Sequence, residues 1–103
     1  MGKFLLSRSE LQEVLESLVP HVYFQPPENV SIQYPCIVYK LDAIQNEHAD
    51  SMTYISNPRY QITLIDYAPD SEYVDPLSDL GYCSFERYYV SENLNHFVFS
   101  IFC

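Results

Sequence analysis

The stretch Arg59-Tyr60-Gln61-Ile62-Thr63-Leu64-Ile65-Asp66-Tyr67 alternates between two sets of side chains. In an extended chain, one side would carry Tyr60, Ile62, Leu64 and Asp66, and the other Arg59, Gln61, Thr63, Ile65 and Tyr67. A period of two residues is typical of a β-strand with one buried face. We therefore predict a strand over residues 59–67 and build the rest of the fold around it.

Four further runs are rich in β-branched and aromatic residues, which favour strands. Residues 21–25 stop at Pro26 and Pro27, which cannot donate to a ladder, and this predicts an edge strand. Residues 34–41 predict a longer strand. A closing hairpin is predicted for the last two runs, residues 82–90 and 96–102, which residues 91–95 join.

One helix precedes these strands. Ser7 followed by Glu10 is a capping box, and Pro20 stops the helix that begins there, so we predict a helix over residues 8–19. Its apolar stripe would consist of Leu11, Val14, Leu15 and Leu18.

A second helix is expected between residues 70 and 80. The pair Asp70-Ser71 would start it, Pro76 predicts that it is short or broken, and Gly81 is the expected C-terminal cap. The order of elements predicts an α+β fold in a single domain covering residues 1–103, with a mainly antiparallel β-sheet and two helices packed on one face.

Composition excludes several classes of protein. With 103 residues the chain suits one domain, and a net charge of −9 is the wrong sign for gripping nucleic acid or an anionic membrane. The two glycines, Gly2 and Gly81, leave no glycine-rich loop for a nucleotide phosphate. No stretch approaches the ~20 apolar residues that span a bilayer.

Residues 42–57 lack a sustained period, and we expect a long loop there. Its acids are Asp42, Glu47 and Asp50, and it contains no Lys or Arg. A solvated loop without a partner is the alternative interpretation of these charges.

No motif indicates catalysis. Cys36, Cys83 and Cys103 are too far apart for a metal pair and have no local signature with His21, His48 or His96. The group Glu47, His48 and Asp50 lacks a tetrahedral ligand set, and Asp66, Asp70, Asp75 and Asp79 lack the spacing of a calcium loop. We predict a protein that is not an enzyme, with no catalytic, cofactor or metal site, and with Cys36 and Cys83 as small buried apolar residues.

Ten tyrosines are too many for one small core, so several are expected on the surface. Exposed tyrosines on sheet faces are typical of subunit interfaces. We therefore expect a homo-oligomer that assembles through sheet edges and aromatic faces, with interface residues Tyr39, Arg59, Gln61 and Arg87.

The chain resembles the tail terminator family of long-tailed bacteriophages over roughly residues 4–102. The resemblance rests on element order and on the runs Phe24-Gln25-Pro26-Pro27, Tyr34-Pro35-Cys36-Ile37-Val38-Tyr39, Arg59-Tyr60-Gln61-Ile62-Thr63-Leu64, Pro69-Asp70-Ser71 and Asn95-His96-Phe97-Val98-Phe99. Pro76 departs from the family's second helix.

The resemblance implies a structural virion protein that forms a hexameric ring on the tail tube, stops tube polymerisation and presents a docking surface for the head connector. Its partners would be the major tail tube protein and the head completion protein, with DNA passing through the lumen without specific binding. It would be made in the host cytoplasm and reside at the head-proximal end of the tail. Asp42, Glu47 and Asp50 would then lie at the lumen or face the tube. The alternatives are another phage neck or tail-completion protein, or a small acidic binding or inhibitory module.

Overall fold

Ser7 starts the first helix, as its pairing with Glu10 predicts. In the computed structural model, which describes residues 7–49 and 53–102, the Ser7 hydroxyl accepts a bond from the Glu10 amide at 3.3 Å. The Glu10 carboxylate accepts one in return from the Ser7 amide at 2.9 Å. Helix α1 then runs over Arg8–Leu18, buries Leu11 and Leu15 completely, and stops before Pro20. The predicted helix over residues 8–19 is confirmed.

Five strands form one sheet in the order β1-β2-β3-β5-β4. Their bounds are β1 His21–Phe24, β2 Cys36–Ala49, β3 Thr53–Asp66, β4 Cys83–Ser91 and β5 Leu94–Phe102. Strand β1 lies at one edge, as predicted, and pairs with β2 in parallel, whereas all other pairs are antiparallel. The α+β fold with a mainly antiparallel sheet is therefore confirmed.

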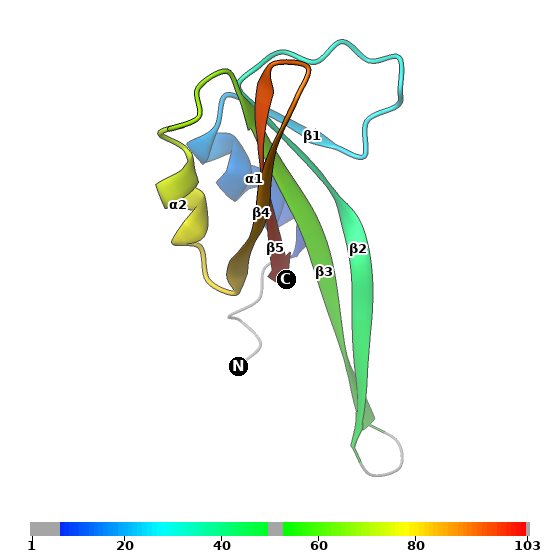
Figure 1. Ribbon diagram of the computed structural model, residues 1–103. Helices are drawn as coiled ribbons and strands as arrows, with labels where there is room; N and C mark the ends of the chain where they lie inside the picture. The colour runs from blue at the N-terminus through cyan, green and yellow to red at the C-terminus, as the bar shows by residue number, and fades with distance from the viewer. Residues whose placement is uncertain (1–6, 50–52, 103) are drawn as a thin grey trace.

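The alternation that predicted the central strand is also present in β3. Tyr60, Ile62 and Leu64 are buried, and they belong to one core cluster with residues of both helices. Both helices consequently cover the same face of the sheet (Figure 1). The core cluster consists of Leu11, Leu15, Val19, Ile37, Tyr39, Tyr60, Ile62, Leu64, Leu77, Phe97, Phe99 and Ile101.

The expected loop over residues 42–57 is wrong. Strands β2 and β3 continue through it and stay paired from Ala43 opposite Arg59 to Ala49 opposite Thr53, with a register shift between Leu41 and Ala43. This two-stranded ribbon, which we call the arm, projects beyond the other strands and gives the molecule extents of 51 × 29 × 23 Å (Figure 1). A strand can be recognised from alternating apolar residues only where one of its faces packs on a core. The arm extends past the core, so the sequence analysis did not detect its strands.

The second helix is short, as Pro76 predicts. Helix α2 covers Val74–Ser78, and Pro76 falls in its first turn, where a missing amide costs no helical bond. The predicted start at Asp70-Ser71 is wrong, because the helix begins only at Val74 with Tyr73 as its N-cap. The Ser71 hydroxyl accepts a bond from the Tyr73 amide at 3.3 Å and donates to Asp66 at 2.6 Å, so it holds the turn before the helix. The predicted cap at Gly81 is also wrong: the cap is Asp79, and the left-handed residue in this segment is Tyr82, with φ 62°.

The closing hairpin is tighter than predicted. Strand β4 pairs with β5 from Cys83 opposite Ile101 to Ser91 opposite Leu94. Only Glu92 and Asn93 remain as the turn, both with positive φ, which is the backbone of a type I′ turn.

Candidate interaction surfaces

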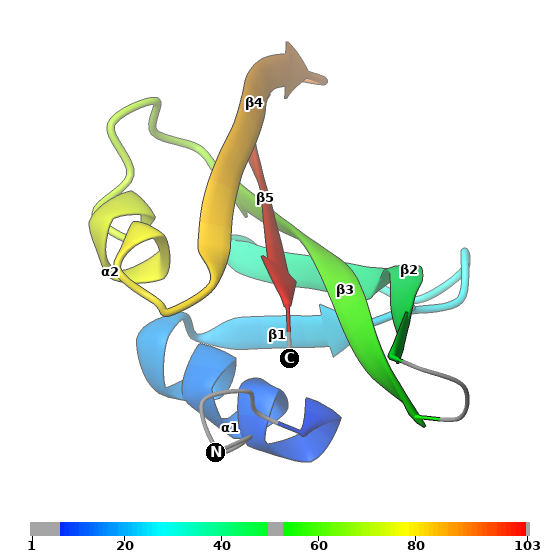
Figure 2. The ribbon, with the colours of Figure 1, turned by 90° about the horizontal axis from the view of Figure 1, so that it is seen from below.

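The two faces of the sheet differ in what covers them. One face carries both helices, and we call the opposite face, on which neither helix packs, the open face (Figure 2). Because side chains alternate along a strand, neighbours of the buried residues of β2, β3 and β5 point to the open face. Most are polar or half-buried, such as Val38, Lys40, Gln61, Thr63 and Ser100. Three are buried: Cys36, Ile65 and Val98.

A shallow groove of about 200 Å³ lies on the open face, lined by Asp42, Arg59, Gln61, Glu86, Arg87, Val98 and Ser100. Arg59 crosses it to Asp42, with Nη2 2.8 Å and Nε 3.0 Å from Oδ2 of that carboxylate. On the β4 side, the Ser100 hydroxyl donates to the Glu86 carboxylate at 2.6 Å. The groove thus joins three strands, β3, β5 and β4, to the base of the arm.

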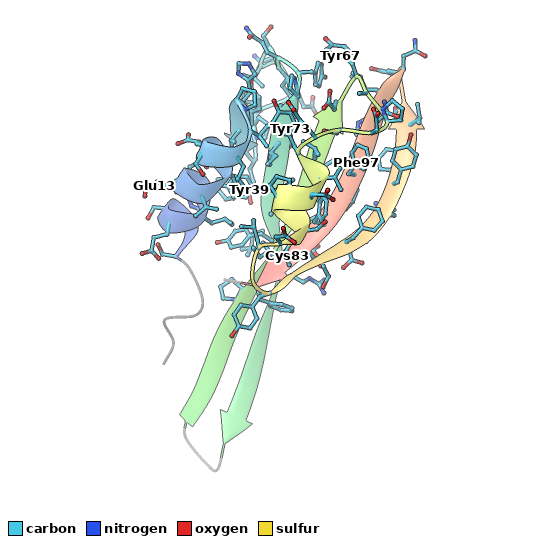
Figure 3. All side chains as sticks on the ribbon, turned by 90° about the vertical axis from the view of Figure 1, so that its left-hand side faces the viewer. Glu13, Tyr39, Tyr67, Tyr73, Cys83 and Phe97 are labelled. Carbon is cyan, nitrogen blue, oxygen red and sulfur yellow. The ribbon has the colours of Figure 1, made fainter. Side chains whose placement is uncertain are left out.

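Three of the four predicted interface residues meet in this groove: Arg59, Gln61 and Arg87. The fourth, Tyr39, is wrongly predicted. It is completely buried on the helix side, where its hydroxyl donates to the Gln12 amide oxygen and its ring packs against Phe24 at 4.9 Å (Figure 3). The run around Tyr39 is apolar on both sides, so alternation could not show which face it would take.

Of the acids predicted to line a loop, Asp42 belongs to the groove and is bound by Arg59. Asp50 lies outside the described residues, as do the side chains of Glu47 and His48, whose backbones belong to β2.

A stack of side chains that the sequence did not reveal continues the open face beyond the groove. The guanidinium of Arg87 lies 5.8 Å from the centre of the Tyr89 ring, and that ring stacks on His96 at 4.6 Å and 13°. Tyr89 and His96 are opposite each other in the β4–β5 ladder. The two-residue turn at Glu92-Asn93 sets this register. A sequence analysis that recognised the turn would have predicted that Tyr89 stands opposite His96.

Strand β4 leaves a row of large apolar side chains exposed at the far edge of the sheet. The Phe85 ring packs edge-on against Phe99 at 5.4 Å, and Tyr88 packs on Phe97 at 5.0 Å, yet both remain about half exposed. The row reaches along the whole strand because the short helix α2 covers little of it. Its members are Phe85 (52% exposed), Tyr88 (44%) and Val90 (58%), and Tyr82, the residue before the strand, is also exposed (55%).

Charge is unevenly divided between the two sides. The helix side exposes seven carboxylates, on α1 and on the segment around α2, namely Glu10, Glu13, Glu16, Asp70, Glu72, Asp75 and Asp79. Against these seven carboxylates the helices carry one base, Arg8, whereas the open face carries Lys40, Arg59 and Arg87 against Asp42 and Glu86. The strong acidity of the chain is therefore concentrated away from the open face.

Cys36 is buried as predicted, whereas the prediction for Cys83 is wrong, because that residue is only half-buried beside the core. Both are poor nucleophiles. Burial raises the pKa of the Cys36 thiol from 9.0 to about 12 and that of Cys83 to about 11, so both stay protonated near neutral pH. Burial also raises the pKa of Tyr34 and of Tyr73. Cys103 lies outside the described residues.

Asp66, the half-buried first member of the acidic series considered for calcium, has a structural role. Its carboxylate accepts bonds from the amides of Tyr67 and Ala68 and from the Ser71 hydroxyl, which fixes the chain between β3 and α2. Within residues 7–49 and 53–102, no group of three or more His, Cys, Asp or Glu side chains is placed to hold a metal ion. None of the described helices is long and apolar enough to cross a membrane.

No protein-family model, no curated protein and no solved structure matches the chain.

Proposed function

We propose that this protein is a structural component of a bacteriophage tail that assembles as a ring on the end of the tail tube, stops tube polymerisation and forms the surface on which the head connector docks. The observation that carries the proposal is the arm: two strands of fourteen residues that run far past the strands flanking them. The open face and the β4 row offer further surface for contacts.

The arm favours assembly because a lone two-stranded ribbon is only marginally stable in water. Beyond Tyr39, β2 has no strand β1 beside it, and before Arg59, β3 has no strand β5 beside it. Contact with another subunit, or with the tube, would supply the neighbours that the arm lacks.

A ring is favoured over a two-fold dimer because the two edges of the sheet are different. One edge is formed by the short β1 and the arm, and the other by β4. Unlike surfaces that meet head to tail generate a ring when the rotation closes. The number of six copies comes from the family resemblance, as do the tube protein, the head completion protein and the DNA in the lumen.

The rival candidate is a small acidic binding module, which the net charge of −9 and the seven carboxylates of the helix side favour. Light scattering coupled to size-exclusion chromatography separates the two. A ring protein is expected to give a mass several times that of the 12.1 kDa chain, and a protein that stays monomeric at high concentration would favour the acidic module.

Electron microscopy of purified phage particles, with gold-labelled antibody against this chain, tests the position in the virion. The proposal expects label at the junction between tail and head. Label only elsewhere in the neck would assign the chain to another completion protein, and particles without label would contradict a virion role.

A further inference from the structure

We propose that the free edge of β4 in one copy pairs with the free edge of β2 in the next copy, along residues 42–49, so that one sheet continues from subunit to subunit. The inference rests on the ring proposed above and names the two edges that meet in it. The partner surface is therefore a second copy of this chain, bound through backbone hydrogen bonds.

The free edge of β4 can be located from its ladder with β5. The Phe102 amide donates to the Tyr82 carbonyl at 3.2 Å, and the pair Ser91–Leu94 closes the two-residue turn at the other end. In an antiparallel ladder, alternate residues turn their backbone groups toward the partner and away from it. With the register shift between Phe85 and Arg87 included, the residues facing outward are Cys83, Phe85, Tyr88 and Val90.

Three of these four residues also belong to the exposed apolar row of β4: Phe85, Tyr88 and Val90. A strand added at this edge would satisfy their outward N–H and C=O groups and cover their side chains at the same time. Charged residues and prolines commonly block such an edge, but the stretch from Tyr88 to Val90 contains neither.

The free edge of β2 begins where β1 ends. The Gln25 side-chain oxygen accepts a bond from the Leu41 amide at 3.1 Å, which closes the edge at that point. Beyond it, Pro58 of β3 stands opposite Ile44. Proline has no N–H, so this is a pair that exchanges no bonds, and the outward backbone groups of β2 are those of Ile44, Asn46 and His48.

The two edges suit each other in length, position and direction. The free part of β2 spans residues 42–49, and β4 spans nine residues. They lie on opposite sides of the sheet, as a head-to-tail interface requires. Strands β2 and β4 run in opposite directions. Rotation about the ring axis keeps the sense of each strand along that axis, so the pair would be antiparallel.

The pairing also determines how the strands are tilted against the ring axis. Across the sheet, Cys83 at the start of β4 is level with Leu41 of β2, because Ile101 and Tyr60 connect them in register. Residues 42–49 lie past that level. Neighbouring copies are therefore staggered along the strand direction, and the strands tilt against the ring axis, as they do when a sheet closes into a barrel.

Two variants that each block one edge test the pairing. Val90→Lys places a charge on the outward edge of β4, and Asn46→Pro removes an outward amide of β2 without touching its ladder with β3. Val30→Lys, at an exposed valine of the β1–β2 connection, is the matched control. Circular dichroism verifies that each variant is folded, and sedimentation velocity measures its mass.

We expect wild type and Val30→Lys to form the ring, and Val90→Lys and Asn46→Pro to be monomers. An equimolar mixture of the two blocked variants is expected to form a one-to-one dimer and nothing larger, because one intact edge remains on each. A wild type that stays monomeric, a blocked variant that still forms rings, or a mixture that stays monomeric would overturn the pairing. Rings that form as expected but fail to stop tail growth would count against the proposed function and leave the pairing standing.

Discussion

Tyr88 and Asn95 connect the edge strand to the centre of the sheet. The Tyr88 hydroxyl on β4 donates to the Asn95 side-chain oxygen at 2.5 Å, and the Asn95 amide group donates to the carbonyls of Asp66 and Tyr67 at 3.3 and 3.0 Å. Asn95 is only 7% exposed. Three strands and the chain leading to α2 thus meet at the Asn95 side chain on β5, and the tyrosine that binds it belongs to the apolar row of β4.

Tyr88→Phe is expected to lower the free energy of unfolding by about 1–2 kcal/mol, because the buried Asn95 oxygen would lose its donor. Urea denaturation measures this difference. Tyr82→Phe is the matched control, since the Tyr82 hydroxyl makes no hydrogen bond among the residues that the structure describes, and its loss should change little. Equal stabilities for the two variants would show that the bond to Asn95 contributes nothing.

Arg59→Glu is expected to weaken ring assembly more than Lys3→Glu, because it places a carboxylate beside Asp42 in the open-face groove. The fold should survive, since a pair as exposed as Arg59 and Asp42 contributes about 0–1 kcal/mol. Sedimentation of both variants, each verified by circular dichroism, measures the effect. If both variants assemble to the same extent, Arg59 is not an interface residue.

The buried Cys36 thiol predicts a loss of stability at high pH. Its pKa is 9.0 in the unfolded chain and about 12 in the folded protein, so deprotonation favours the unfolded chain once the pH exceeds 9. The contribution is fully present below pH 9 and is lost as the pH rises toward 12. Urea midpoints between pH 8 and pH 11 should fall more steeply for wild type than for Cys36→Ala, and parallel curves would contradict the assignment.

The acids of the arm remain a prediction about the channel. Asp42 is bound by Arg59, so the test uses Glu47→Lys with Asp50→Lys in a phage complementation assay that scores assembly and DNA delivery separately. If these carboxylates repel passing phosphates, particles should assemble normally and deliver DNA less efficiently. Overlong tails would identify the arm as the tube-docking surface instead, and normal tails with normal infectivity would show that the charges have no role in the channel.

The sequence predicted those elements whose pattern is created by burial. Helix α1 and strand β3 each pack one face on the core, so their periods of 3.6 and two residues are visible in the chain. The sequence did not predict the groove, but three residues predicted for an interface line it, because Arg59 and Gln61 occupy the polar side of β3, opposite Tyr60 and Ile62, and Arg87 lies on β4 beside them.

Other features depend on contacts that local sequence does not encode. The arm lies beyond the core, and its sequence has no sustained alternation of apolar and polar residues, so a loop was predicted there. Tyr39 sits in a run that is apolar on both sides, and only packing against α1 decides its face. Ser71 was expected to start α2, but its hydroxyl bridges Asp66 and the Tyr73 amide in the turn before the helix, and the helix begins at Val74.

The length of tail tubes tests the central claim most directly. The proposed function places the gene in a phage genome. There the gene is inactivated and the tails in lysates are measured by electron microscopy, with and without the wild-type protein supplied from a plasmid. A ring that caps the tube predicts tails that grow past their normal length and lack heads, and a return to uniform, head-bearing particles on complementation. Tails of normal, uniform length joined to heads in the absence of the protein would contradict the account.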